Sequence, residues 1–451
     1  MHTYIRFRNP RFSFAELLDK NNTQSPLFRI SAQAAALKQN PQGEAVNHKV
    51  IHELRLFGTV LRSSLKSQVG DFIKTIRLAA KDAEDDLNKA LDNFAAGLRE
   101  VDRSFGELSK ELSLVNTRRE LKETLVFARD FLSLEIQNNL TILLDVYSRS
   151  RGKAPKKTWD ALVGIVEEQI AARSERNSSL IRSAEDTNEN FSYWEGILKK
   201  YFQGVLYLDV RDKDATGKAQ HIFYGIAAGL AMLLSVMLGY WIGMRFTSQQ
   251  STSFIIAIVA AYIVKDRIKD IVRAYSGNIM RLFFPDRKFA IEDPLSLKEI
   301  GTVRETTHFI APRYLPADVR EARSSGHMTR IEKEGKPEEI FVYHKVVDLN
   351  TRKISRRYSR RRDVDDIIRF NVRKLIQYAD DSFHFDKVWD SKTKKIRKIK
   401  CAKVYHLNLI IRMETLAKQR KLPAKQKKKT ISFKRVRVIL NQDGIVRMRE
   451  V

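Results

Sequence analysis

Residues 222–244 read IFYGIAAGLAMLLSVMLGYWIGM, a run of 23 residues without a charged side chain. A helix of this length measures roughly 34 Å, enough to cross a bilayer core of about 30 Å. Phe223 and Tyr224 lie at one end and Tyr240 and Trp241 at the other, where aromatic rings favour the lipid–water interface. A soluble core helix normally has a polar face, and this run has none. The sequence therefore predicts a transmembrane helix over 222–244.

A second apolar segment follows at about 252–266, with the uncharged core FIIAIVAAYIV at 254–264. Because a spanning helix needs about 20 apolar residues, a re-entrant or interfacial helix is the alternative. Positive charge favours two spans, since the loop between the segments holds only Arg245 and the flanks hold Arg211, Lys213, Lys218, Lys265, Arg267, Lys269 and Arg273. The positive-inside rule then predicts a two-helix transmembrane hairpin within 211–276, with both soluble regions cytoplasmic, as in a bacterial inner membrane protein.

Small residues recur along both apolar segments. They let helix backbones approach closely where lipid offers no hydrophobic drive for association. We expect them to pack the two helices of one hairpin together or to join two copies of the chain. The predicted helix-packing residues are Gly225, Gly229, Gly239, Gly243, Ala257 and Ala261.

The chain of 451 residues carries a formal net charge of +28. The excess is local, because residues 351–451 hold 31 Lys and Arg against 10 Asp and Glu. Such a charge points to an anionic partner, either a nucleic acid or a lipid surface. The single Cys401 excludes a disulfide framework and fits a reducing compartment. The N-terminal residues lack the apolar stretch of a cleavable signal peptide, so we expect the first span to act as the targeting signal.

Residues 1–43 mix aromatic side chains with Asn, Pro and Gln, and we expect a loose arm there. From Val46 to Val115, apolar residues recur with a mean spacing of about 3.6, the period of a helix with one apolar stripe. Gly70, followed by Asp71, is the expected turning point of that helix. Further helices are expected over 117–147 and 159–181. A helix with an apolar stripe on one side must bury that stripe against another helix. The pattern over residues 44–210 therefore predicts an elongated all-α helical bundle or coiled coil.

Beyond the membrane segments the pattern changes to strands. Prolines predict an irregular connector over 277–338, followed by a small basic α+β domain over 339–451. Alternation predicts strands at 339–349, 404–413 and 433–440, with a hairpin turn at 441–444 into 445–451. Asp363, with Asp365 and Asp366 behind it, predicts the start of one helix over 364–379. The fold class is thus mixed: helical bundle, membrane hairpin and basic α+β domain.

Three basic runs dominate the C-terminal domain, at 352–362, 392–400 and 418–429. Lys and Arg clusters of this density bind polyanions through counterion release, and Tyr358 within the first run can stack on a base. The alternatives are attraction to anionic lipid, at about 1 kcal/mol for each cation near the surface, or mere solubility. The predicted polyanion-binding residues are Arg352, Lys353, Arg356, Arg357, Tyr358, Arg360, Arg361, Arg362, Lys394, Lys395, Arg397, Lys398, Lys427, Lys428 and Lys429.

Catalytic signatures are missing from the sequence, which has no GxxxxGKS/T, HExxH, GxSxG or EF-hand pattern. Asp380, Ser382, His384 and Asp386 share a face if that stretch is extended, but four ligands from one short strand converge poorly on one ion. We therefore predict no metal site, no cofactor and no catalytic residue.

These features favour a non-enzymatic, membrane-anchored scaffold or sensor. Its helical region would oligomerise or bind a partner protein, and its cationic domain would bind nucleic acid or anionic lipid headgroups. One alternative is a membrane-bound nuclease or nucleotide-acting enzyme whose active site in the C-terminal domain has no recognisable motif. The other is a structural membrane organiser. A polar cleft in the C-terminal domain would favour the enzyme, and a flat basic face would favour binding.

Overall fold

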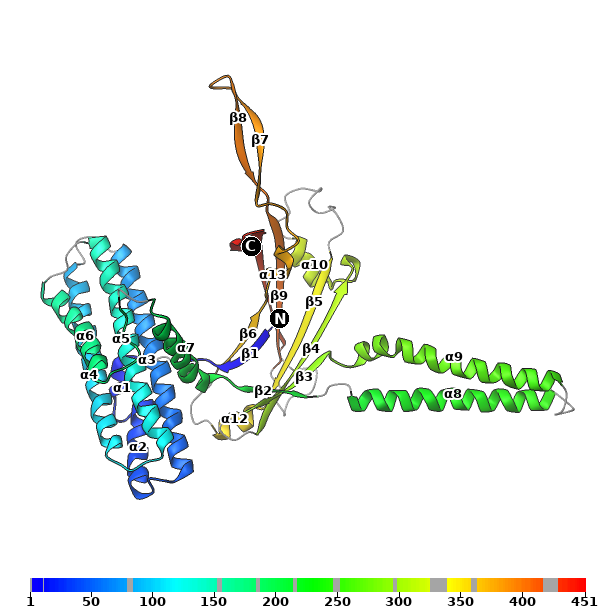
Figure 1. Cartoon of the computed structure of the whole chain (residues 1–451), viewed down its shortest axis with the longest axis horizontal. Helices are drawn as coiled ribbons and strands as arrows, with labels where there is room; N and C mark the ends of the chain where they lie inside the picture. The colour runs from blue at the N-terminus through cyan, green and yellow to red at the C-terminus, as the bar shows by residue number, and fades with distance from the viewer. Residues whose placement is uncertain are drawn as a thin grey trace.

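A computed structural model describes residues 2–10, 12–78, 84–151, 156–183, 187–213, 217–245, 252–294, 298–324, 339–357, 363–416 and 429–451. Long helices form a bundle at one end of the molecule, and strands form a central β-region (Figure 1). Two helices and a slender β-hairpin leave this β-region in different directions (Figure 1). The predicted combination of long helices with a separate β-region is confirmed.

The bundle consists of α3 (Glu44–Leu78), α4 (Glu84–Ser113), α5 (Arg119–Arg151), α6 (Lys156–Glu175) and α7 (Glu189–Gln203). The predicted apolar stripe supplies much of its core, since side chains such as Leu54, Leu61 and Leu98 are buried. Each fully buried side chain of this kind contributes about 1.5–3 kcal/mol. Phe131 of α5 and Phe202 of α7 stack at the centre, with their ring centroids 4.4 Å apart.

The predicted turn at Gly70 is wrong, because α3 continues through Gly70 to Leu78. A glycine inside a helix costs only about 1 kcal/mol relative to alanine. Val69 and Ile76 are buried on either side of Gly70. Their burial outweighs the cost of the glycine.

Residues 2–39, expected to form a loose arm, instead form β1 (His2–Phe7), α1 (Phe14–Leu18) and α2 (Pro26–Gln39). Ser13 and Glu16 form a capping box at the start of α1. Leu17 and Ile30 are buried in the core that the bundle helices share. The expectation failed because the apolar residues are divided among three short elements, none long enough to show a period.

β1 pairs antiparallel with β6 (Val364–Arg369), from Phe7 opposite Val364 to His2 opposite Arg369. The predicted helix over 364–379 is therefore wrong, and only the short α13 (Arg373–Ile376) lies within it. Across the ladder, the carboxylate of Asp365 lies 3.0 Å from the guanidinium of Arg8. Of the acidic residues that suggested a helix start, Asp363 and Asp365 are ion-pair partners of arginines in and just after β1, and Asp366 pairs with Lys345.

A four-stranded antiparallel sheet contains, in order, β2 (Asp209–Lys213), β3 (Arg287–Glu292), β4 (Glu299–Ile310) and β5 (Ile340–Leu349). Residues 277–338, expected to be irregular, thus provide two strands and α10 (Ala317–Ser324). The prolines that suggested an irregular connector flank these elements rather than interrupt a ladder. β2 also pairs with β3 across the whole segment predicted to enter the membrane, from Asp209 opposite Glu292 to Lys213 opposite Lys288.

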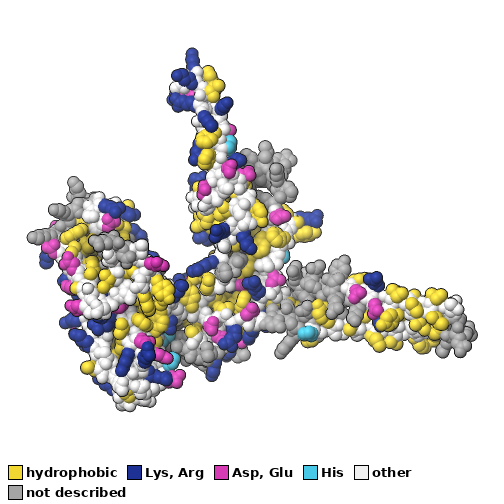
Figure 2. All heavy atoms as spheres, in the orientation of Figure 1, with side chains coloured by type: hydrophobic (Ala, Val, Ile, Leu, Met, Phe, Trp, Pro, Cys, Tyr) yellow, Lys and Arg dark blue, Asp and Glu magenta, His cyan; other side chains and the backbone are white. Residues whose placement is uncertain are grey.

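Between β2 and β3 lie α8 (Gly217–Arg245) and α9 (Thr252–Phe283), which run antiparallel and side by side (Figure 1). Many of their apolar side chains are exposed, and they appear as yellow surface on the helix pair (Figure 2). Within the described residues, only Tyr224–Met244 of α8 is long and apolar enough to cross a membrane. The predicted pair of spans is therefore found only in part, because α9 turns from apolar to charged at Lys265.

The remaining elements follow β5. They are α12 (Thr351–Arg357), a two-stranded hairpin of β7 (Phe383–Asp390) and β8 (Lys395–Ala402), and a three-stranded sheet. This sheet contains β9 (Tyr405–Leu416), β10 (Lys429–Asn441) and β11 (Gly444–Glu450). The predicted strands at 339–349, 404–413, 433–440 and 445–451 are confirmed, as is the turn between the last two, where Gly444 has a φ of 142°.

Candidate nucleic-acid interface

β7 and β8 form a projecting hairpin, here called the arm (residues 383–402) (Figure 1). At its tip, Asp390 Oδ1 accepts hydrogen bonds from the backbone N–H groups of Lys392 at 2.9 Å and Thr393 at 3.3 Å. The Thr393 side chain and these backbone bonds hold the pKa of Asp390 below its ordinary value. Lys394 closes the turn with a φ of 48°, in the left-handed region. At the base of the arm, the two flanking residues are joined by a hydrogen bond: the backbone N–H of Lys403 donates to Ser382 O at 3.0 Å.

The two faces of the arm differ, because side chains alternate along a strand and the ladder fixes which strand residues share a face. One face carries three aromatic rings and three lysines but no carboxylate, and we call it the cationic–aromatic face. Its members are Phe383, Phe385, Lys387 and Trp389 of β7 and Ile396, Lys398, Lys400 and Ala402 of β8.

Contacts within the cationic–aromatic face confirm that rings and cations lie together. The ammonium of Lys400 is 3.6 Å from the centroid of the Phe383 ring, and that of Lys398 is 4.5 Å from the centroid of Phe385. The Trp389 side chain is 59% exposed and that of Phe385 is 51% exposed. The ring centroids of Phe383 and Phe385 are 5.4 Å apart, in an edge-to-face arrangement. Blue and yellow side chains accordingly mingle over the arm (Figure 2).

The opposite face is nearly neutral. It carries His384, Asp386, Val388 and Asp390 of β7 and Lys395, Arg397, Ile399 and Cys401 of β8. Its two carboxylates balance its two permanent cations, and Asp390 Oδ2 lies 3.0 Å from Arg397 Nε. The excess positive charge of the strands is thus concentrated on the face that also bears the rings.

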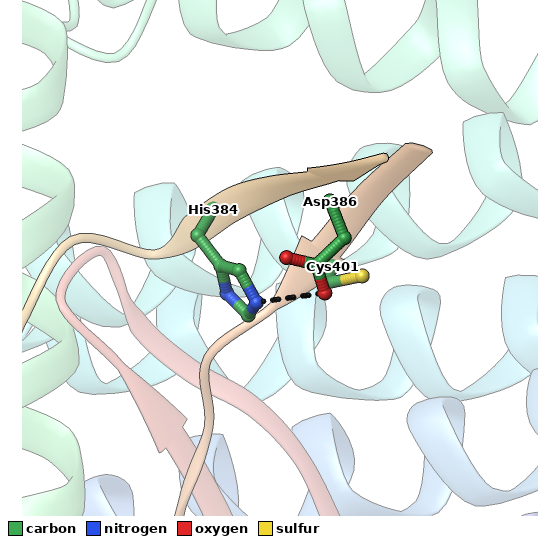
Figure 3. Close-up of side chains that lie close together, drawn as sticks. All are labelled: His384, Asp386 and Cys401. Atoms are coloured by element: carbon green, nitrogen blue, oxygen red, sulfur yellow. Dashed lines mark hydrogen bonds and ion pairs between the residues drawn. The ribbon is translucent and has the colours of Figure 1, made fainter. Parts of the chain in front are cut away.

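Three side chains of different chemistry meet on this opposite face: His384, Asp386 and Cys401 (Figure 3). His384 and Cys401 are direct partners in the ladder, and His384 Nε2 lies 3.2 Å from Asp386 Oδ2. Partial burial and a hydrogen bond with Asp386 raise the pKa of the Cys401 thiol. The sequence grouped His384 with Asp386 but missed Cys401, which lies on the other strand.

Those predicted polyanion-binding residues whose side chains the structure describes do not form one surface. Lys394, Lys395, Arg397 and Lys398 lie on the arm, divided between its tip and both faces. Arg352 and Lys353 lie on α12, at the end of β5 opposite the arm (Figure 1). Lys353 is already engaged there, since its Nζ donates to the backbone oxygen of Glu299 at 2.9 Å.

The other predicted polyanion-binding residues cannot be placed against the arm. Arg356 and Arg357 end α12 and Lys429 begins β10, but the structure does not describe their side chains. The remaining residues lie outside the described part of the chain; they are Tyr358, Arg360, Arg361, Arg362, Lys427 and Lys428.

The predicted helix-packing residues separate into two groups. Ala257 and Ala261 of α9 line the groove between the helices, facing Leu238 and Ile242 of α8. A Cβ atom added to any of Gly225, Gly229, Gly239 and Gly243 would meet no described atom within 4 Å. Among the described residues, the glycines therefore do not join α8 to α9, and contact with a second copy of the chain stays a prediction.

Sequence reasoning missed the most informative residues, namely the rings of Phe383, Phe385 and Trp389 and the ammonium groups of Lys387 and Lys400. Their alternation in FHFDKVWD (383–390) was the available signal, with the basic run 392–400 as the partner strand. Comparison with known proteins adds no independent assignment: the chain matches no protein-family profile, no curated protein and no solved structure.

Proposed function

We propose that this chain is a membrane-anchored, non-enzymatic protein that binds single-stranded nucleic acid through the cationic–aromatic face of the arm. The observation that carries the proposal is the joint exposure of three rings and three lysines without a carboxylate. Lysines neutralise phosphates with release of counterions, while exposed rings stack on unpaired bases of any sequence. A face with both groups suits a single strand better than a duplex, whose bases are already stacked.

The direction of the arm supports nucleic acid over a lipid surface as its partner. The arm leaves the β-region in a different direction from α8 and α9, so the ring-bearing strands do not extend toward the apolar helices (Figure 1). A lipid-binding arm would be expected to lie beside the surface that those helices enter.

The membrane anchor in this proposal is the α8–α9 hairpin, which enters the bilayer and returns to the same side. Two ladders support it: β2 pairs with β3 immediately outside the hairpin, and β1 pairs with β6. Segments joined by backbone hydrogen bonds cannot lie on opposite sides of a bilayer. The positive flanks, including Arg211 and Lys213, favour the cytoplasmic side.

The bundle serves as a scaffold in this proposal, because its most unusual polar group is used internally. Arg173 is 2% exposed, and its guanidinium donates to Ser133 Oγ at 2.6 Å and to Leu180 O at 3.2 Å. Burial lowers the pKa of Arg173 to about 10. An arginine fully paired with core groups fixes helix positions rather than binding a ligand.

The test compares Trp389→Ala with Val388→Ala, its sequence neighbour on the opposite face. The full chain in uncharged detergent is titrated with a fluorescent single-stranded oligonucleotide at about physiological salt. Loss of a stacking ring should weaken binding by about 1–3 kcal/mol, or about 5- to 150-fold, without changing the salt dependence. Val388→Ala removes a neighbouring apolar side chain and should have little effect.

A second variant separates charge from stacking. Replacing Lys387, Lys398 and Lys400 with Gln should reduce the slope of log K against log salt by about 0.7 for each phosphate that is no longer neutralised, or about 2 in total. The proposal is wrong if the wild-type chain ignores the oligonucleotide, or if Val388→Ala weakens binding as much as Trp389→Ala. Binding to anionic but not neutral nanodiscs, combined with no oligonucleotide binding, would establish the lipid alternative.

A further inference from the structure

The arm has almost no core of its own. Of the sixteen residues in β7 and β8, all are exposed except Asp390 and Cys401, which are half-buried. A two-stranded hairpin without a packed face is marginally stable in water. Small structures of this kind commonly gain stability from a disulfide or a bound metal ion. With one cysteine in the chain, a disulfide within the arm is impossible.

The His384, Asp386 and Cys401 cluster supplies the donors that such an ion requires. It offers an imidazole nitrogen, a carboxylate oxygen and a sulfur, and one donor atom of each lies within 4.8 Å of the other two. Two donors come from β7 and one from β8, so an ion bound by all three would tie the strands together (Figure 3). The ladder already places His384 opposite Cys401, so the backbone needs no rearrangement.

The distances fit a tetrahedral ion after small side-chain movements. Zinc bonds of about 2.0–2.3 Å place neighbouring ligand atoms about 3.3–3.7 Å apart. The donor atoms of the three side chains must therefore move together by about 1 Å to reach these distances, and rotations about χ1 and χ2 can provide such shifts. His384 and Asp386 are about half exposed, with side-chain accessibilities of 46% and 54%, so an ion can reach them directly from solvent.

We infer that His384, Asp386 and Cys401 bind a divalent transition-metal ion of the zinc class, which clamps the base of the arm. Sulfur and imidazole donors select zinc-class ions over magnesium or calcium, which prefer all-oxygen sites. On binding, the thiol proton of Cys401 passes to solvent and the thiolate becomes the ligand. Three protein ligands leave the fourth position to water. The site lies on the face opposite the nucleic-acid surface and does not depend on that proposal.

The experiment uses cobalt(II) as a spectroscopic probe on the full chain, purified in detergent and treated with a chelator. We expect one cobalt ion per chain, with a near-ultraviolet sulfur-to-metal band and visible bands of tetrahedral intensity. Cys401→Ser should abolish the sulfur band, while His384→Ala and Asp386→Asn should each weaken cobalt affinity at least tenfold. His406→Ala, an exposed histidine on β9, is the matched control and should leave the titration unchanged.

Amide hydrogen exchange gives a second readout that does not rely on colour. Zinc should slow exchange along β7 and β8 of the wild-type chain and should have no such effect in Cys401→Ser. The inference is overturned if wild-type protein shows no sulfur-to-metal band with excess cobalt. It is also overturned if His384→Ala and Asp386→Asn bind cobalt as tightly as the wild type, because Cys401 would then use other ligands.

Discussion

For the proposed membrane anchor, the depth to which α8 and α9 would enter a bilayer follows from how the two helices pair. Leu238 and Ile242 of α8 line one groove with Ala257, Ala261 and Val264 of α9. Because the helices are antiparallel, residues after Val264 run alongside the part of α8 that precedes Leu238. The first six residues of that continuation, 265–270, include five charged ones: Lys265, Asp266, Arg267, Lys269 and Asp270.

Full insertion of α8 would therefore carry the charged part of α9 to the middle of the bilayer. Each Lys, Arg or Asp there costs about 2.5–3.5 kcal/mol, so five cost on the order of 10 kcal/mol even with some charges near the interface. In return, the half of α8 nearest the sheet would bury exposed side chains such as Ile226, Leu230 and Leu233. At about 0.3–0.6 kcal/mol each, these three side chains gain only about 1–2 kcal/mol.

Shallow insertion instead places one described charged residue, Arg245 at the end of α8, near the bilayer centre, which costs about 2.5–3.5 kcal/mol. Because five charges near the centre cost more than one, we expect the hairpin to insert only as far as Val264. The inserted apolar part of α9, residues 254–264, would then measure roughly 16 Å, about half of a bilayer core of about 30 Å. Trp241, near the loop end of α8 and 58% exposed, should lie near the bilayer centre. Full crossing would instead place Trp241 at the far interface.

Depth-dependent fluorescence quenching distinguishes the two positions. The full chain, with Trp159, Trp194 and Trp389 changed to Phe, is reconstituted in vesicles whose lipids carry quenchers at known depths. We expect the strongest quenching of Trp241 by labels at the chain ends of the lipids. Replacing the five charged residues at 265–270 with Leu should move Trp241 toward the far headgroups.

Labelling gives an independent check of the same reasoning. Met244→Cys, in a Cys401→Ser background, should resist a membrane-impermeant thiol reagent added to the side opposite the soluble regions. Efficient labelling of Met244→Cys from that side, together with strong quenching of Trp241 by headgroup labels, would refute the shallow hairpin and restore two full spans.

Two further predictions concern the bundle, measured by thermal unfolding of the full chain in detergent. Gly58→Ala should destabilise the bundle by about 1–3 kcal/mol, because the added Cβ would lie 2.8 Å from the Phe202 ring. In Gly70→Ala, on the same helix, the added Cβ meets no described atom within 4 Å, so this change should stabilise the bundle by up to about 1 kcal/mol. Equal effects of the two would contradict the packing at Gly58. Burial raises the pKa of Glu135 despite its 2.9 Å ion pair with Arg62. A raised folded-state pKa gives stability that is present below the unfolded pKa of about 4.3 and is lost as pH rises through the folded value. Wild type should thus lose stability relative to Glu135→Gln across that interval, and parallel pH profiles would exclude this role.

The sequence predicted best those elements whose pattern repeats many times. The helical stripe from Val46 to Val115 correctly indicated buried faces in both α3 and α4. It could not locate the end of α3, because a single glycine such as Gly70 costs less than the neighbouring contacts contribute. Periodicity identifies a face, whereas the end of a helix depends on what the next residues can contact.

Local sequence patterns could not predict contacts between segments that are distant in the chain. Arg8 and Asp365 are 357 residues apart, yet their side chains meet at 3.0 Å across the β1–β6 ladder. Asp363, Asp365 and Asp366 resemble the start of a helix because acidic groups favour a helix N-terminus. The same groups stabilise a strand when cations face them: Arg6 and Arg8 pair with Asp363 and Asp365, and Lys345 pairs with Asp366. The local preference of these acidic residues for a helix start was overridden by pairing with β1, a strand that only the fold brings near.

The arm shows why the candidate site was only half visible. Lysine is uncommon in strands, so the basic run 392–400 suggested a solvated segment rather than a ladder partner. Once Asp390 and Lys395 are paired across a short turn, every other pairing follows, and Cys401 falls opposite His384. The same register assigns Lys398 and Lys400 to the face of Phe385 and Phe383. A shift of one residue would exchange the faces of β8, separating these lysines from the rings and Cys401 from its neighbours. One turn at 391–394 therefore determines both the proposed nucleic-acid surface and the proposed metal site, because each needs the same register.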